Sequence, residues 1–99
     1  MVARIATYTY SGDAQELGER AEAGILPILK VQPGFRSYAV AISEDKVFSS
    51  SAWDSRAEAE SGSAAVAAWV AENMTEISLL GSVEYAEVAF STALGVSTA

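Results

Sequence analysis

Four segments of the chain have the apolar patterns typical of β-strands. Residues 2–10, VARIATYTY, are rich in β-branched and aromatic side chains. Residues 35–43 and 47–54 flank the short polar turn Glu44-Asp45-Lys46, which predicts a hairpin. Residues 82–90, SVEYAEVAF, predict a last strand, and the tail 91–99 is expected either to fray or to extend it.

Between the first two strands the apolar positions recur with helical spacing. Asp13 and Glu16 form a capping-box pattern at the start of this helix, and Gln32-Pro33-Gly34 ends it. Pro27 lies inside the helix, where we expect it to bend the last turns over a twisted sheet. The apolar stripe consists of Leu17, Ala21, Ile25, Ile28 and Leu29.

A second helix is predicted between the hairpin and the last strand. Ser55 and Glu58 form another capping-box pattern. Because glycine costs about 1 kcal/mol relative to alanine inside a helix, Ser61-Gly62-Ser63 predicts a break or a loosened turn. The stripe of this helix is predicted to run through Val66, Trp69, Val70, Asn73 and Ile77.

The predicted order of elements is β-α-β-β-α-β. This order is typical of the α+β ferredoxin-like fold, a four-stranded antiparallel sheet with two helices on one face. The chain has 99 residues, of which 51% are apolar and 19% charged, so we expect one globular domain over residues 1–99 with its core in residues 2–90.

Neither face of the predicted sheet is strongly polar. The two faces of strand 35–43 carry Arg36, Tyr38, Val40 and Ile42 on one side and Phe35, Ser37, Ala39, Ala41 and Ser43 on the other. Two helices cover only one face, and soluble monomers avoid a bare apolar patch of several hundred Å². We therefore expect a symmetric homodimer through the open sheet face. The alternative is that its small alanine and serine side chains tolerate exposure.

The charge and composition exclude several classes of protein. A net charge of -7 argues against binding to nucleic acid or to an anionic membrane, which need basic patches. The absence of cysteine excludes disulfides and thiolate chemistry and agrees with a cytoplasmic protein. The absence of histidine excludes Ser-His pairs, most zinc sites and histidine-ligated haem. The acidic residues show no clustered motif, so we expect no metal site.

Two motifs resemble those of the antibiotic biosynthesis monooxygenase family. Residues 30–38 read KVQPGFRSY, and residues 52–59 read AWDSRAEA. In that family a Pro-Gly-Phe follows the first helix, and a Trp-x-Ser/Asp-x-x-Glu/Ala stretch joins the third strand to the second helix. The resemblance covers residues 2–90 and implies a dimeric α/β barrel.

The resemblance also implies candidate activities: cofactor-free oxygenation of anthrone-like polyketides, quinol oxidation, or haem degradation. Haem-degrading relatives use an Asn on the first strand, then a Trp and a His in the second helix. This chain has Thr7 and Tyr8 on the first strand, Gly62 early in the helix, and no histidine. We therefore exclude haem degradation and expect no cofactor.

Cofactor-free oxygenation needs an apolar pocket, a proton relay and donors for a developing oxyanion. The candidate catalytic residues are Tyr38, as the proton relay, and Arg36, to hold an enolate. The candidate pocket walls are Tyr8, Trp53 and Trp69. The alternative interpretation places the aromatic side chains in the core and Arg36 on the surface or at the dimer edge.

Three functions are consistent with the sequence. The first is a monooxygenase-like enzyme acting on an aromatic, polyketide or quinol-type small molecule. The second is an isomerase or lyase of a small cyclic compound. The third is a dimer without catalysis that binds a small molecule or responds to stress. A buried Tyr38 with Arg36 pointing into the same pocket would favour the enzymes, and a cavity filled completely by side chains would favour the third.

Overall fold

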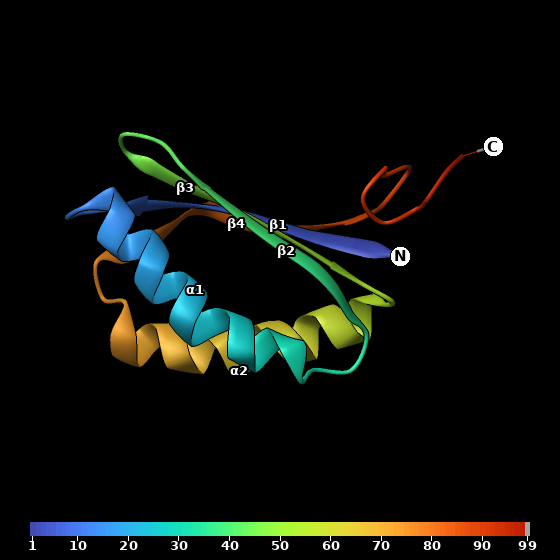
Figure 1. Cartoon of the computed structure of the whole chain (residues 1–99), viewed down its shortest axis with the longest axis horizontal. Helices are drawn as coiled ribbons and strands as arrows, with labels where there is room; N and C mark the ends of the chain where they lie inside the picture. The colour runs from blue at the N-terminus through green and yellow to red at the C-terminus, as the bar shows by residue number, and fades with distance from the viewer. Residues whose placement is uncertain (99) are drawn as a thin grey trace.

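The protein consists of two layers, an antiparallel sheet and a pair of helices packed on one of its faces (Figure 1). The computed structural model describes residues 1–98. The strands lie in the sheet in the order 35–42, 46–53, 2–10 and 77–87, which confirms the predicted ferredoxin-like fold. None of the helices within residues 1–98 has the length and apolar character needed to cross a membrane. The elements are β1 (Val2–Tyr10), α1 (Ala14–Lys30), β2 (Phe35–Ile42), β3 (Lys46–Trp53), α2 (Arg56–Asn73) and β4 (Ile77–Glu87).

Both helices begin at the predicted capping residues. The Asp13 carboxylate accepts a hydrogen bond of 2.9 Å from the backbone N–H of Glu16. The Ser55 hydroxyl accepts one of 3.2 Å from the backbone N–H of Glu58 and donates one of 2.9 Å to the Glu58 carboxylate. Each side chain satisfies a backbone donor that has no partner within its helix. Helix α1 continues through Pro27 to Lys30.

The predicted break at Ser61-Gly62-Ser63 is wrong, because α2 is continuous from Arg56 to Asn73. Gly62 is buried, and a β-carbon at this position would overlap the indole ring of Trp53. Glycine is therefore required here for the close approach of a side chain from β3. This contact outweighs the modest cost of glycine in a helix.

The last strand begins earlier than predicted, at Ile77, which the sequence pattern had assigned to the second helix. Arg20 of α1 lies at the end of α2. It donates a hydrogen bond of 3.0 Å to the backbone carbonyl of Asn73, the last residue of α2, and pairs with the Glu76 carboxylate. A hydrogen bond from its own backbone N–H, together with Arg20, holds the pKa of Glu76 below its ordinary value. Ile77 then pairs with Tyr10 of β1.

Gly81 lies inside β4 rather than before it. Its φ of 76° belongs to the left-handed region, which glycine tolerates best. The register between β1 and β4 shifts between Ile5 and Thr7, next to this residue. Gly81 thus allows an irregularity within β4. The sequence pattern predicts the start of the strand at this irregularity, although the strand begins at Ile77. The strand ends at Glu87, and Ser91 and Val96 then bridge a short hairpin; Ala99 lies outside the described residues.

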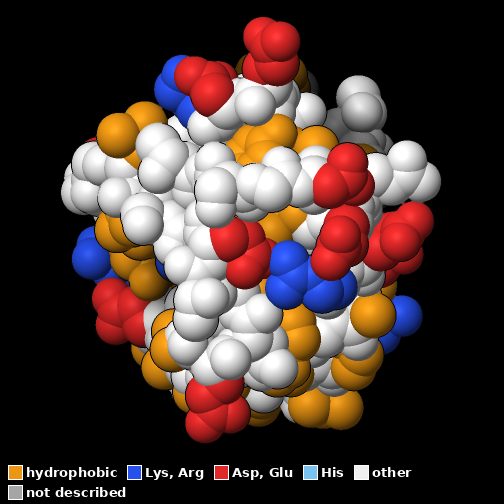
Figure 2. All heavy atoms as spheres, turned by 90° about the vertical axis from the view of Figure 1, so that its left-hand side faces the viewer, with side chains coloured by type: hydrophobic (Ala, Val, Ile, Leu, Met, Phe, Trp, Pro, Cys, Tyr) orange, Lys and Arg blue, Asp and Glu red, His pale blue; other side chains and the backbone are white. Residues whose placement is uncertain are grey.

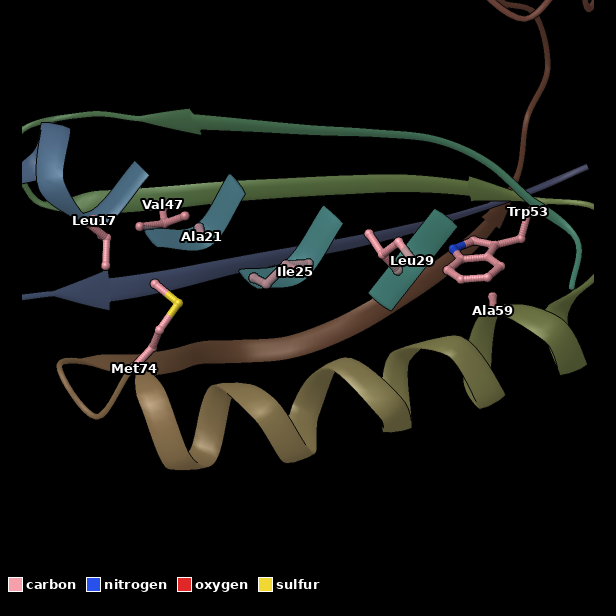
Figure 3. Packing of buried hydrophobic residues seen from close by; sticks show 8 residues of the cluster. All are labelled: Leu17, Ala21, Ile25, Leu29, Val47, Trp53, Ala59 and Met74. Carbon is pink, nitrogen blue, oxygen red and sulfur yellow. The ribbon is translucent and has the colours of Figure 1, made fainter. Parts of the chain in front are cut away.

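The hydrophobic core lies between the sheet and the two helices (Figure 3). Helix α1 supplies four buried apolar side chains at helical spacing, as its stripe predicted. Trp53 is 0% exposed and packs near Ala59 at one end of α2, whereas Met74 lies at the other end. The buried cluster consists of Leu17, Ala21, Ile25, Leu29, Val47, Trp53, Ala59 and Met74.

The face of the sheet opposite the helices keeps large apolar side chains in contact with solvent. Thr7 pairs with Phe48 of β3 and with Leu80 of β4, so these three residues form one row on that face. Ile5 lies on the same face of β1. Ile5, Phe48 and Leu80 are each 46% exposed. As expected from the sequence, the sheet of a single chain therefore has an apolar face that the helices do not cover.

Two glycines of α1 are expected to respond in opposite ways to substitution by alanine. A β-carbon at Gly18 would meet only Ile42, at 3.5 Å, so Gly18→Ala is expected to raise the free energy of unfolding by roughly 0.5–1 kcal/mol through helix propensity. A β-carbon at Gly24 would overlap the ring of Trp69, so Gly24→Ala is expected to lower it by about 1–3 kcal/mol. Urea unfolding measures both. Equal stability of the two variants would contradict the packing of Trp69 on Gly24.

Candidate functional site

A cavity of about 260 Å³ lies between the sheet and the helices. Its walls are mainly apolar side chains from both helices and from β1, β2 and β3. Trp53, the last residue of β3, lines the cavity beside the start of α2, and Met74 lines it at the end of that helix (Figure 3). The layer between the helices and the sheet therefore contains free space, and the alternative of a layer filled completely by side chains does not hold.

The cavity exists because small side chains face each other across it. Ser63, Ala67 and Ala71 follow one another at spacings of four residues and therefore share one face of α2. Ser49 and Ser51 line the cavity from β3. Interiors are otherwise packed as densely as organic crystals, so such a gap is uncommon. Ala67 and Ala71 are also solvent-exposed, which places the entrance beside this part of α2.

A row of polar side chains crosses the helix-facing side of the sheet under this cavity. The register pairs Tyr38 of β2 with Ser51 of β3, and Ser51 with Arg4 of β1. Tyr8 lies four residues after Arg4 on the same face, and its hydroxyl oxygen accepts a hydrogen bond of 3.4 Å from Nη2 of Arg4. Tyr38, Arg4 and Tyr8 all line the cavity.

Arg4 is a cation without a counterion. Within residues 1–98 its guanidinium forms no ion pair, and its Nε is buried with no hydrogen-bond acceptor. No Asp or Glu is among the described residues that line the cavity. Arg4 as a whole is half-buried, and a charge partly removed from water is unfavourable unless it is paired, so an anionic ligand would stabilise it.

Tyr38 is a neutral phenol at ordinary pH. Burial raises its pKa above 10.0, and the neighbouring Tyr8 acts in the same direction. A hydrogen bond between the side chains of Tyr38 and Ser49, and the charge of Arg4, oppose this rise. Because the net shift is upward, Tyr38 enters any reaction protonated and acts first as a hydrogen-bond donor.

Trp53 closes one end of the site. Its indole N–H donates a hydrogen bond of 2.9 Å to the Ser51 hydroxyl, which satisfies a buried donor. Its ring meets Phe35 edge to face, with the ring centroids 5.5 Å apart. Trp53 therefore holds Ser51 in place while it forms part of the cavity wall.

The structure brings together three of the five residues proposed from the sequence, namely Tyr38, Tyr8 and Trp53. Arg36 lies outside the cavity, 53% exposed, and donates a hydrogen bond of 2.6 Å to Asp54. A register shift after Phe35 is the reason, because it turns Phe35 toward the core where strict alternation would have placed Arg36. Trp69 is also outside, packed against α1 at Gly24.

Sequence reasoning missed Arg4. Its position in β1 is on the same face as Ala6 and Tyr8, so strand alternation could have placed it under the helices. A charged residue within an apolar alternation was the available signal. The stripe of small residues on α2 was missed too, since alanine and serine are common on helix surfaces.

The described residues offer no metal site. Residues 1–98 contain no group of three or more Asp, Glu, His or Cys side chains placed to hold a metal ion. The charged group that lines the cavity is Arg4, which suits an anion.

No protein-family model matches the chain. No curated protein matches it either. Solved structures do match. A mutant of SnoaB, a cofactor-independent oxygenase from Streptomyces nogalater, has a TM-score of 0.72 at 12% identity, with 92% of this chain and 95% of that chain covered. A Chloroflexus aurantiacus protein assigned to the antibiotic biosynthesis monooxygenases has a TM-score of 0.66 at 17% identity, with 96% and 100% covered.

The chain has the fold of the antibiotic biosynthesis monooxygenases. This confirms the fold of the single chain that the two sequence motifs implied, and the dimer that they also implied stays a prediction. MupZ from Pseudomonas fluorescens shares it with a TM-score of 0.71 at 11% identity over 85% of this chain. The chain spans 65% of the length of MupZ. At such identities the likeness concerns the fold, and function must be argued from the site.

Proposed function

We propose that the protein binds a small aromatic compound in its cavity and oxidises it with molecular oxygen, without a cofactor. The observation that supports this most directly is an unfilled apolar cavity lined by a protonated phenol, Tyr38. An unfilled cavity favours a ligand over the alternative in which side chains occupy the whole layer. SnoaB, which has the same fold, is itself a cofactor-independent oxygenase.

The size of the cavity limits the ligand. A cavity of about 150 Å³ lined by apolar side chains holds a benzene molecule. The cavity of about 260 Å³ is larger and has an entrance beside Ala67 and Ala71. Fused aromatic rings fit this space when one edge reaches the entrance. Phenols, anthrones and quinols are therefore the substrate class proposed.

The proposed reaction of an anthrone uses molecular oxygen as its only oxidant. The CH₂ group of the anthrone first loses a proton to water, which gives the carbanion. The substrate carbanion passes one electron to oxygen, and the resulting radical and superoxide join in a C–O bond to give a peroxide. The Tyr38 hydroxyl protonates the outer peroxide oxygen, and the resulting phenolate takes the remaining proton from the same carbon. The O–O bond then breaks and hydroxide leaves. Overall a CH₂ group and O₂ give a C=O group and H₂O.

Oxygen uptake with an anthrone and with a naphthoquinol tests this proposal. Wild-type protein is expected to consume oxygen well above the rate without protein, and a chelator is expected not to change that rate. Tyr38→Phe is expected to lower kcat about 100-fold or more, since it removes a positioned proton relay, with little change in KM.

The matched control is Tyr10→Phe. The Tyr10 hydroxyl donates a hydrogen bond of 2.8 Å to the backbone carbonyl of Ser43, outside the cavity. This variant is expected to retain wild-type oxygen uptake. No uptake with either substrate, or equal effects of the two substitutions, would count against the proposal.

We also propose that the protein is a homodimer formed through the open sheet face. The apolar row of Phe48 and Leu80, together with Ile5, supports this, because it is exposed on the face opposite the helices. Two such faces packed on each other would give a symmetric interface. The cavity lies on the other side of the sheet, so each chain would keep its own site.

A further inference from the structure

We infer that Arg4 makes the cavity a site for the anionic form of a phenol or enol, whose ionised oxygen pairs with the guanidinium. That the ligand is aromatic rests on the proposed function, whereas its negative charge is inferred from Arg4 itself. The ligand loses its proton to water on entering the cavity. Arg4 is thereby the residue that activates the ligand.

The first argument is the missing counterion. The Arg4 Nε is buried without an acceptor, and Nη2 has one long hydrogen bond to a phenol. A guanidinium prefers planar anionic partners and presents five donors in a fixed fork. No acidic side chain of residues 1–98 lines the cavity to satisfy it. An anionic oxygen from a ligand would complete the site.

The second argument is that the neighbouring polar groups also suit an anion. Tyr8 accepts from Arg4, so its own hydroxyl proton remains available to another acceptor. Tyr38 is protonated and lies in the same row of the sheet as Arg4. Two phenols therefore line the same cavity as one cation, and as hydrogen-bond donors they favour an oxygen that carries negative charge.

The third argument is the absence of a base. The described lining residues include no carboxylate, lysine or histidine that could remove a proton from the ligand. The titratable and charged groups next to Arg4 are Tyr8 on its own strand, Tyr38 across β3, and Tyr85 on β4, over which Arg56 of α2 lies at 4.8 Å. These groups are phenols and cations, and the Glu60 carboxylate beside them is paired with Arg56 at 2.9 Å and does not line the cavity. Ionisation must then come from stabilising the anion.

The surface charge of the protein has the sign opposite to that of Arg4 in the cavity. The net charge is -7, and Asp and Glu side chains are spread over the end of the molecule that Figure 2 shows, with few Lys and Arg among them. Such a surface does not attract anions from a distance. A preference for anionic ligands would therefore come from the cavity and not from the overall charge.

An anaerobic titration of 2-naphthol tests the inference without any oxidation. Naphthol and naphtholate have different absorption spectra, so the ionisation of the bound ligand can be followed directly as pH is raised. Wild-type protein is expected to lower the pKa of bound 2-naphthol by about one to three units, the effect typical of an opposite charge within a few ångströms. For each unit by which this pKa is lowered, 2-naphtholate is expected to bind tenfold more tightly than neutral 2-naphthol.

Two variants separate the role of Arg4 from that of positive charge elsewhere. Arg4→Gln is expected to abolish the pKa shift, and Arg4→Lys to retain part of it. The control is Arg36→Gln, because Arg36 is paired with Asp54 outside the cavity. It is expected to behave as wild type. Circular dichroism verifies that each variant is folded.

Wild-type protein alone can refute the inference. It is overturned when 2-methoxynaphthalene, which cannot ionise, binds as tightly as 2-naphthol at high pH, when bound 2-naphthol titrates as in water, or when no probe binds. Tighter binding of 2-naphthoate than of 2-naphtholate would assign the site to carboxylates and overturn the choice of phenols and enols. A shifted pKa without oxygen uptake would uphold this inference and refute only the proposed oxidation.

Discussion

Replacing Phe48 by glutamate is expected to convert the proposed dimer into a monomer. Phe48 lies in the middle of the open sheet face, on β3, with Thr7 of β1 beside it. In a symmetric interface each substitution occurs twice, so two uncompensated carboxylates would have to be buried. The cost of burying them, several kcal/mol for each ion, exceeds what the remaining apolar contacts can offset. Sedimentation equilibrium of wild type and Phe48→Glu measures the mass directly.

Val31→Glu provides the control for this change. Val31 is 78% exposed and follows α1, away from the sheet. The substitution introduces the same charge in place of an apolar side chain, and we expect it to leave the dimer intact. A wild-type protein that sediments with the mass of one chain would show that the apolar face tolerates exposure, which was the alternative interpretation of its small side chains.

Ala67→Phe is expected to abolish binding of 2-naphthol while the protein remains folded. Ala67 lines the cavity on α2 and is exposed at its entrance, so a phenyl ring there would occupy the space that the ligand needs. Because the ring would fill an existing cavity, the free energy of unfolding is expected to rise by about 0.5–2 kcal/mol. Calorimetric titration and urea unfolding measure the two effects.

Ala68→Phe is the matched control for the cavity. Ala68 is the next residue of α2, is exposed, and does not line the cavity. We expect this variant to bind 2-naphthol as wild type does and to gain no stability from packing. If Ala67→Phe bound the ligand unchanged, the ligand would have to lie elsewhere, and both the proposed function and the role of Arg4 would lose their site.

The local features of the chain were predictable because they depend on neighbours in sequence. The caps at Asp13 and Ser55 and the stripe of α1 follow from residues within a few positions of one another. The hairpin follows from a polar turn between two apolar runs. From these elements the order β-α-β-β-α-β and the bare sheet face could both be derived. Tyr38, Tyr8 and Trp53 were proposed for a pocket on other grounds, namely the chemical needs of an activity that the family resemblance implied, and all three line the cavity.

The errors all occurred where distant residues decide the local structure. Gly62 remains helical because the ring of Trp53 lies against it, and Ile77 is in a strand because Tyr10 pairs with it. Arg36 was assigned to the cavity by strict alternation, which a register shift after Phe35 interrupts. Each case depends on a contact between segments that are far apart along the chain.

The sequence by itself determined the elements, their order, and the excess of apolar residues on both faces of the sheet. These follow from the spacing of side chains along one strand or helix, which the backbone geometry makes periodic. Only the tertiary structure decided that small residues of α2 face serines of β3 and leave a cavity, and that Arg4 lies in it without a counterion. Packing and pairing between layers depend on register and on distances between segments, and no periodicity within a segment specifies them.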